Sequence, residues 1–204
     1  MIEQGSDDWK ALRLGKATAS RMADICAKTK TGWGASRANY AAQLIAERLT
    51  GVAAESYTNA AMEWGTVTEA DARAAYAFYQ DAVVELATFV PHPSIAMSGA
   101  SPDGLIGPDG LVEIKCPNTA THIETLLKGG VPEKYILQMH WQMACTGREW
   151  CDFVSFDPRM PENLRLFVKR IQRDSVLLLD LEDKVNEFLS EVHTKTSMLQ
   201  DMAS

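Results

Sequence analysis

The spacing of hydrophobic positions changes from a helical period to a strand period near residue 80. Before that point, apolar residues recur every three or four positions, which is typical of amphipathic helices. The pattern predicts helices over residues 7–13, 18–25, 36–49 and 66–79. Ser6 and Thr18 are suited to cap the first two. The polar, glycine-rich residues 28–36 indicate a loop between the second helix and the third.

Beyond residue 80, short runs of apolar and β-branched residues favour strands. They predict strands over residues 83–90, 94–98, 149–156 and 164–171. Two further helices are expected, one between Pro132 and Gly147 and one over residues 175–199. This order predicts an α/β fold with a mixed central β-sheet flanked by helices. We expect a single domain over residues 1–204, with a helical part to about 80, a core over about 81–175 and a closing helix over about 175–200.

Residues 101–115 combine a hairpin signal with charged side chains. Residues 107–110 (Gly-Pro-Asp-Gly) predict a tight turn between two strands. Because strand side chains alternate between faces, Glu113 and Lys115 share one face and the neighbouring aliphatic residues occupy the other. Asp103, at the end of the first arm, reaches the same small volume. Two carboxylates and an amine suit a hard cation such as Mg²⁺ and a water nucleophile.

A simpler interpretation fits the same residues. An aspartate followed after nine residues by Glu-x-Lys occurs often by chance, and charged strand faces are commonly just solvated. The hairpin taken alone therefore leaves two alternatives open, a nuclease-type metal site and a solvated Glu/Lys pair.

Composition limits the class of protein without naming its activity. The chain has 204 residues, 46% of them hydrophobic, which suffices for a well-buried α/β core. It shows no apolar run of membrane-spanning length and no secretory signal, and its four cysteines lack CxxC spacing. We therefore expect a cytoplasmic protein with unpaired thiols.

The net charge of −7 argues against nucleic-acid binding until its distribution is considered. Between Lys10 and Arg48 there are eight basic and two acidic residues, so this segment carries +6 and the remainder −13. Binding to phosphate depends on the local potential, so a DNA substrate is not excluded. A solvated basic helical face explains the same asymmetry.

Seven short motifs occur in order over nearly the whole chain and together resemble the phage lambda exonuclease family, the YqaJ-like viral recombinases of the PD-(D/E)xK nuclease superfamily. They are residues 4–6, Trp9, and residues 12–20, 64–73, 101–104, 113–117 and 156–160. The resemblance implies a restriction-endonuclease-like core. It also implies an Mg²⁺-dependent, processive 5′-to-3′ exonuclease that acts on double-stranded DNA ends, releases 5′-mononucleotides and leaves 3′ single strands for recombination by strand annealing.

The resemblance also implies a catalytic set of Asp103, Glu113, Lys115 and Glu69. Two Mg²⁺ ions, which Mn²⁺ can replace, would be held by the three carboxylates and the carbonyl of Ile114. Lys115 would orient or deprotonate the attacking water, and its amine should titrate low beside two metal ions. Without the resemblance, Glu69 would be an exposed helix acid.

A pocket for the 5′-phosphate is implied in the same way, formed by Arg13, Ser20, Ser101 and Gln138. A terminal phosphate needs a cationic fork together with hydroxyl donors, which these residues supply. Taken alone, Arg13 is a surface helix charge and Ser20 makes a local backbone bond. Gln138 is the least secure member, because Gln142 lies one turn on and shares its helix face.

Two DNA-contacting positions depart from the best-known member of the family. Met62 stands where an aliphatic wedge would part the strands, and a flexible methionine can still serve there. Lys30 stands where an arginine would reach into the duplex. Because lysine lacks the bidentate guanidinium, its contact with DNA is expected to be weaker. His140 and Trp141 are expected in the packed core, although their helix also lets them line the cleft.

The family further implies a homotrimeric ring and a single-strand annealing protein as partner, in a phage or prophage acting inside a bacterial cell. A ring with a basic channel and an acidic exterior would reconcile the net charge with a DNA substrate. Two other functions remain as alternatives: a structure-specific endonuclease with the same site, and a DNA-binding scaffold with a decayed nuclease core.

Overall fold

A five-stranded mixed sheet contains the hairpin predicted from the sequence. The structure is a computed structural model and describes residues 2, 4–54 and 60–203. Along the sheet the order is β10-β9-β8-β7-β4, with β8 and β9 parallel and the other neighbours antiparallel. These strands are β4 (Val84–Glu85), β7 (Gly104–Ile106), β8 (Gly110–Lys115), β9 (Trp150–Phe156) and β10 (Leu166–Gln172).

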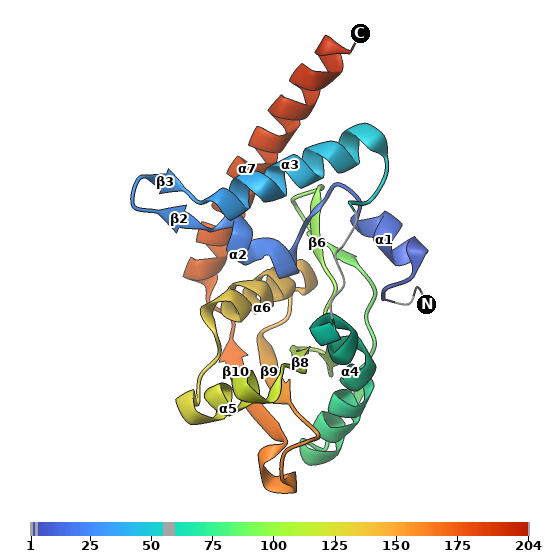
Figure 1. Ribbon diagram of the computed structural model, residues 1–204, viewed down its shortest axis with the longest axis vertical. Coiled ribbons are helices and arrows are strands. Elements are labelled where there is room, and N and C mark those ends of the chain that lie inside the picture. Colours follow the sequence, from blue (N-terminus) through green and yellow to red (C-terminus); the bar gives the residue numbers. More distant parts are fainter. Residues whose placement is uncertain (1, 3, 55–59, 204) are drawn as a thin grey trace.

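The remaining elements surround this sheet (Figure 1). The helices are α1 (Asp7–Arg13), α2 (Met22–Ile25), α3 (Ala35–Thr50), α4 (Ala60–Tyr79), α5 (Thr119–Lys128), α6 (Glu133–Thr146) and α7 (Ser175–Met202), with 3-10 turns η1 (Ala19–Arg21) and η2 (Glu162–Leu164). A three-stranded sheet is formed by β1 (Ala17–Thr18), β6 (Ser98–Ala100) and β5 (Val90–Pro91), and a small hairpin by β2 (Lys28–Thr29) and β3 (Gly32–Trp33).

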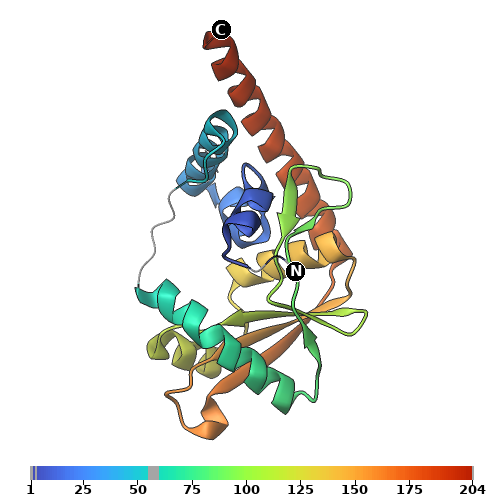
Figure 2. The same ribbon diagram turned by 90° about the vertical axis from the view of Figure 1, so that its right-hand side faces the viewer.

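Helices cover both faces of the main sheet, because its strands are apolar on both sides. On one face, Ala72 and Tyr76 of α4 pack against β8 and β9. On the other face, Met139 and Met143 of α6 pack against Leu111 and its neighbours. Figure 2 shows α4 lying across the sheet, away from α6. Two layers of helices therefore enclose β8, the strand that carries Glu113 and Lys115.

The N-terminal helices pack with α6 and α7 into a second core. Tyr40 of α3 stacks on Phe188 of α7 with 5.4 Å between ring centroids, and Trp141 of α6 is fully buried in the same cluster. The C-terminal part of α7 projects beyond the rest of the chain (Figure 1). No helix within the described residues is long and apolar enough to cross a membrane.

The predicted fold class is confirmed, and several of its elements are where the pattern placed them. α1 begins after Ser6, whose Oγ accepts a hydrogen bond from the Trp9 amide at 3.2 Å. α6 begins after Pro132 and ends at Gly147, which adopts the left-handed conformation that favours glycine. α3, β9, β10 and α7 also lie where expected.

Other predicted boundaries of helices and strands were wrong, some of them because contacts between distant segments changed them. The helix predicted over residues 18–25 is shortened, because Ala17 and Thr18 pair with β6 as β1. The expected loop over 28–36 contains the β2–β3 hairpin. The strand predicted over 83–90 is divided between two sheets as β4 and β5. The strand predicted over 94–98 is a turn up to Ser98, in which the amides of Ser94 and Ile95 donate to His92 Nδ1. α5 was not predicted at all, and α4 begins before residue 66.

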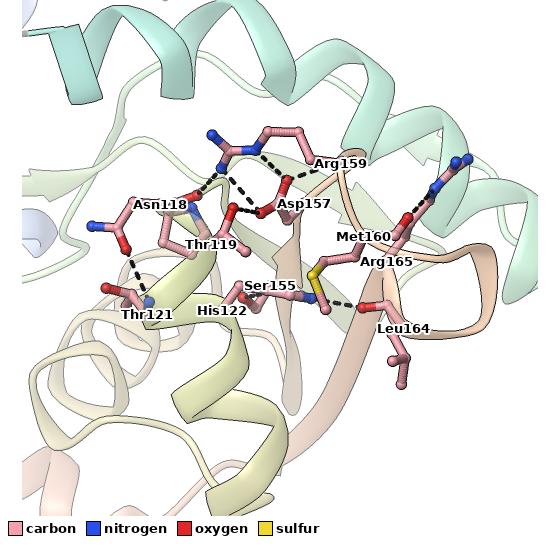
Figure 3. A network of polar contacts seen from close by, with 11 residues as sticks. Asn118, Thr119, Thr121, His122, Ser155, Asp157, Arg159, Met160, Leu164 and Arg165 are labelled. Atoms are coloured by element: carbon pink, nitrogen blue, oxygen red, sulfur yellow. Dashed lines mark hydrogen bonds and ion pairs between the residues drawn. The ribbon is translucent and has the colours of Figure 1, made fainter.

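The motif at residues 156–160 ties the end of β9 to three other segments (Figure 3). The Asp157 side chain is fully buried and accepts hydrogen bonds from Arg159 Nε at 2.7 Å and from Thr119 Oγ1 at 2.6 Å. Arg159 also donates to the Pro117 carbonyl at 3.3 Å, and its guanidinium lies 4.4 Å from the centroid of the Trp64 ring of α4. The network therefore joins the end of β9 to the start of α5, to α4 and to Pro117, which follows β8.

We expect Asp157→Asn to destabilise the protein at neutral pH and to do so less in acid. Burial alone would raise the pKa of Asp157, but hydrogen bonds from Arg159 and Thr119 outweigh it and lower the pKa to about 2. A carboxyl with a lowered pKa stabilises the fold fully above its unfolded pKa, and this contribution is lost as the pH falls towards the folded value. The variant should lose about 2 kcal/mol at pH 7. Denaturant unfolding at several pH values measures the loss.

The matched control is Asp7→Asn, because Asp7 pairs with Lys10 on the exposed surface of α1. An exposed ion pair contributes little, so this variant should keep the stability of the parent chain. The difference in unfolding free energy between the Asp157 variant and the parent chain should become smaller as the pH falls below about 4. If this difference in unfolding free energy stayed constant from pH 7 to pH 3, the assigned role of Asp157 would be contradicted.

Candidate active site

Glu113 is buried in the centre of the molecule and does not face water. Its side chain is 0% exposed, although it lies on the predicted charged face of β8. Gln138 Nε2 donates to Oε1 at 2.6 Å, and Gln142 Nε2 donates to Oε2 at 2.5 Å. Lys115 forms an ion pair with Oε1. Because a buried carboxylate must be compensated in this way, the solvated-hairpin interpretation is wrong for Glu113.

Asp103 reaches the same volume from the neighbouring arm of the hairpin, as predicted. Its Oδ2 accepts a hydrogen bond from the Ile114 amide at 2.7 Å, which fixes the carboxylate beside β8. Burial, and then the charge of Glu113, raise the pKa of Asp103 well above its ordinary value, although Lys115 opposes the change. The two carboxylates are therefore close enough to repel each other.

Glu69 approaches this pair from α4, on a different element. Burial is the largest cause of its raised pKa, and Glu113 raises it further, while Arg73 and Lys115 lower it. Arg73 forms an ion pair with Glu69 Oε1 and donates through Nε to the Asp103 carbonyl at 3.3 Å. The sequence contained this link as a Glu-Arg pair four residues apart on one helix face, but Arg73 was not singled out as a site residue.

Lys115 completes the cluster as a cation. Burial would lower its pKa, but Glu113 and Asp103 outweigh burial and raise it. The amine therefore keeps its proton in this arrangement, and the low pKa expected beside two metal ions stays a prediction. Its side chain remains 29% exposed, so Nζ can still meet a substrate in the cleft.

The donor set fits a hard divalent cation. Within the described residues, no three acidic, histidine or cysteine side chains stand together as a ready-made metal cluster. Burial is the main cause that raises the pKa values of Asp103 and Glu69, and a bound cation would favour their ionised forms. Hard cations such as Mg²⁺ prefer carboxylate and carbonyl oxygens, and Asp103, Glu113, Glu69 and the carbonyl of Ile114 are of that kind.

A second polar group lies around Arg13, at the end of α1. Arg13 donates to Ser101 Oγ at 3.2 Å, and its guanidinium stacks 4.2 Å above the Trp9 ring. Trp9 Nε1 donates to the same Ser101 oxygen at 3.0 Å. Burial lowers the pKa of Arg13, with a partial offset from Tyr40 and Glu47. In the part of the chain that is described, no carboxylate forms an ion pair with Arg13, so an anion would stabilise it.

The other predicted phosphate contacts make hydrogen bonds to different partners. Ser20 is exposed, and its Oγ lies 3.4 Å from Thr18 Oγ1. Gln138 binds Glu113 and thereby belongs to the carboxylate cluster. Gln142, which the sequence offered as an alternative on the same helix face, binds the second oxygen of Glu113.

Of the two predicted DNA-contacting side chains, the structure describes one. Lys30 is exposed in the turn between β2 and β3. Met62 is in the first turn of α4, and its side chain lies outside the described part of the structure. His140 and Trp141 are buried, as expected for core residues, with Trp141 Nε1 donating to Ser98 Oγ at 3.0 Å.

An open cavity adjoins Glu69. Its volume is about 520 Å³, and Trp9, Thr66, Glu69 and Arg73 are among the residues that line it. A larger hollow of about 760 Å³ lies around Tyr79, and its lining includes none of the clustered charged groups. Of these two hollows, the smaller is the one lined by residues of both groups, Trp9 beside Arg13 and Glu69 with Arg73 from α4.

Comparisons with known proteins show the family to which this chain belongs. A family model described as the YqaJ-like viral recombinase domain matches residues 8–149. The crystal structure of an alkaline exonuclease (LHK-Exo) from Laribacter hongkongensis is 49% identical, with a TM-score of 0.91 over 97% of this chain and 98% of that one. LHK-Exo in complex with dAMP gives the same values.

More distant comparisons are less informative. A phage-related exonuclease from Haemophilus somnus 129PT is 17% identical, with a TM-score of 0.68 over 93% of this chain and 96% of that one, and it supports the fold alone. The comparison with curated proteins gave no match.

Proposed function

Because this chain belongs to the family of YqaJ-like viral recombinases, we propose that it is an exodeoxyribonuclease that hydrolyses phosphodiester bonds at the ends of duplex DNA. The family resemblance drawn from the seven motifs is confirmed by the match over residues 8–149. The observation that carries the proposal is the gathering of Asp103, Glu113 and Lys115 on one hairpin, with Glu69 close enough to interact electrostatically from the wall of an open cavity. We further propose that residues 1–204 form one nuclease domain of the PD-(D/E)xK type.

Each residue of the cluster has a distinct role in this proposal. Asp103, Glu113, Glu69 and the Ile114 carbonyl would hold two Mg²⁺ ions, which stabilise the charge that develops on the attacking and leaving oxygens when bound. Lys115 holds its proton at Nζ and donates a hydrogen bond, which orients a water or a phosphate oxygen in the cleft. Arg73 holds Glu69 beside the hairpin through its contacts with Glu69 and the Asp103 carbonyl.

The Arg13 group supplies direction to the reaction. A terminal 5′-phosphate carries more negative charge than an internal phosphodiester, and the half-buried guanidinium of Arg13, which forms no ion pair within the described residues, would recognise that difference. Ser101 Oγ accepts hydrogen bonds from both Arg13 and Trp9 and so keeps the Arg13 guanidinium in position. Digestion would then run from 5′ to 3′, with a new 5′-phosphate after each step and a 3′ single strand left behind.

The assembly and partners belong to the same proposal. We propose a homotrimeric ring acting in the cytoplasm of a bacterial host, with a single-strand annealing protein that receives the 3′ strand. The support is the family membership and the basic segment from Lys10 to Arg48 in an otherwise acidic chain. A ring encloses its DNA, so processivity does not need a strongly basic protein.

We expect Asp103→Asn and Lys115→Met each to reduce cleavage of a linear duplex by at least about a hundredfold, the scale of loss when a group that moves or orients a proton is removed. Both replacements keep the size of the side chain and remove its charge. Release of mononucleotides from a labelled duplex measures the effect, and duplex-end binding should persist.

The matched control for Asp103 is Asp109→Asn, because Asp109 is an exposed residue in the turn of the same hairpin. It should cleave as the parent chain does. Near-normal cleavage by either site variant would show that the catalytic set has been misassigned. Degradation of covalently closed circular DNA would instead indicate an endonuclease.

Divalent cations should separate binding from turnover. We expect Mg²⁺ or Mn²⁺ to support cleavage, and Ca²⁺ to support end binding without cleavage, because Ca²⁺ forms longer bonds in a looser geometry. The measurement compares digestion and fluorescence anisotropy on one labelled duplex after removal of trace metals. Brisk digestion in Ca²⁺ alone would rule out the proposed arrangement of ligands.

The Arg13 group should set the preference for phosphorylated ends. The parent chain is expected to digest a 5′-phosphorylated duplex roughly ten- to a hundredfold faster than a 5′-hydroxyl duplex, the range of a charge-assisted hydrogen bond. Arg13→Ala should bring this ratio towards one and shorten the tracts digested per binding event. Lys10→Ala is the control, since Lys10 lies on α1 but pairs with Asp7 at the surface. An undiminished preference in the Arg13 variant would place the phosphate pocket elsewhere.

A further inference from the structure

Gln142 occupies a position that packing alone does not explain. It is 0% exposed, in the middle of the apolar face that α6 presents to the sheet, between Met139 and Met143. A buried amide is costly unless its donor and acceptor are both satisfied. Nε2 donates to Glu113 Oε2 at 2.5 Å, and Oε1 lies 3.9 Å from the thiol of Cys151 on β9.

The orientation of this amide is fixed by its neighbours. A carboxylate paired with a lysine accepts hydrogen bonds, so the NH₂ group of Gln142 faces Glu113. Its carbonyl then faces Cys151, and burial raises the pKa of that thiol well above its ordinary value, so the thiol stays protonated and can donate. The amide cannot be reversed without placing two acceptors together.

The two oxygens of Glu113 are held in different ways. Oε1 is shared by Gln138 and Lys115, both of which retain some exposure. Oε2 is held by Gln142, which is fully buried. A change in Lys115 or Gln138 on substrate binding therefore leaves one oxygen of Glu113 fixed from the core.

We propose that Gln142 is a positioning residue that fixes the orientation of the Glu113 carboxylate for cation binding, supported from behind by Cys151. The inference rests on the proposed function, in which Glu113 is a ligand of the divalent cation. Hydrogen-bonding partners of a ligating carboxylate set its direction, and their removal commonly lowers metal affinity or activity by roughly 10- to 100-fold.

The test is Gln142→Met, which keeps the volume of the side chain and removes both hydrogen bonds. Mn²⁺ binding to the DNA-free chain, followed by calorimetry, should weaken roughly 10- to 100-fold. On 5′-phosphorylated duplex, kcat should fall by a similar factor while KM stays nearly constant. Cys151→Ala, which removes only the rear support, should give a smaller loss in the same direction.

Met143→Leu is the matched control, because Met143 is equally buried on the next position of α6 and has no bond to Glu113. It should keep the Mn²⁺ affinity and kcat of the parent chain. Equal losses in Met143→Leu and Gln142→Met would overturn the inference, since the effect would be one of core packing. Should Gln142→Met not fold, Gln142→Asn replaces it, with an amide one carbon too short to reach Glu113.

Glu113→Gln separates this inference from the proposed function. If Glu113→Gln loses cleavage and Mn²⁺ binding while Gln142→Met retains both, the positioning role is wrong and the function stands. If Glu113→Gln itself cleaves DNA as well as the parent chain, the proposed active site is wrong.

Discussion

The burial of one ionised carboxylate, Glu113, constrains the rest of the structure. Removing a carboxylate from water costs several kcal/mol unless hydrogen bonds and opposite charge compensate it. Here Lys115 supplies the charge, and Gln138 and Gln142 supply the donors. These partners come from two elements, so α6 must lie against β8 at one register for the carboxylate to be tolerated. Apolar packing of α6 alone would permit neighbouring registers, because the hydrophobic effect is non-directional.

The features that the sequence predicted are the ones encoded locally. The turn at residues 107–110 and the alternation along β8 placed Asp103, Glu113 and Lys115 together, and Pro132 and Gly147 bounded α6. The features that were missed depend on contacts between distant segments. β1 exists because Ala17 and Thr18 pair with β6, some 80 residues on, and a short pairing of this kind leaves no periodic signal.

The roles of the polar side chains were the hardest to predict, for the same reason. The helix face shared by Gln138 and Gln142 was visible in the sequence, but not which acid it would meet. Arg73 was visible as an i,i+4 partner of Glu69, but its bond to the Asp103 carbonyl depends on how α4 lies against the hairpin. A spacing rule gives neighbours on one element, whereas a site needs the relative position of several elements.

The relative position of α4 and the sheet is fixed by polar contacts outside the site. Tyr76 of α4 donates to Asp152 of β9 at 2.7 Å, and Arg159 beyond the end of β9 stacks on Trp64 of α4. Both contacts are directional, and they lie on either side of Glu69 along the helix. Together they set the depth at which Glu69 meets Asp103 and Glu113, which the apolar face of α4 alone would not determine. The motif at residues 156–160 is therefore explained without contact with substrate: it holds the helix that brings the third carboxylate to the other two.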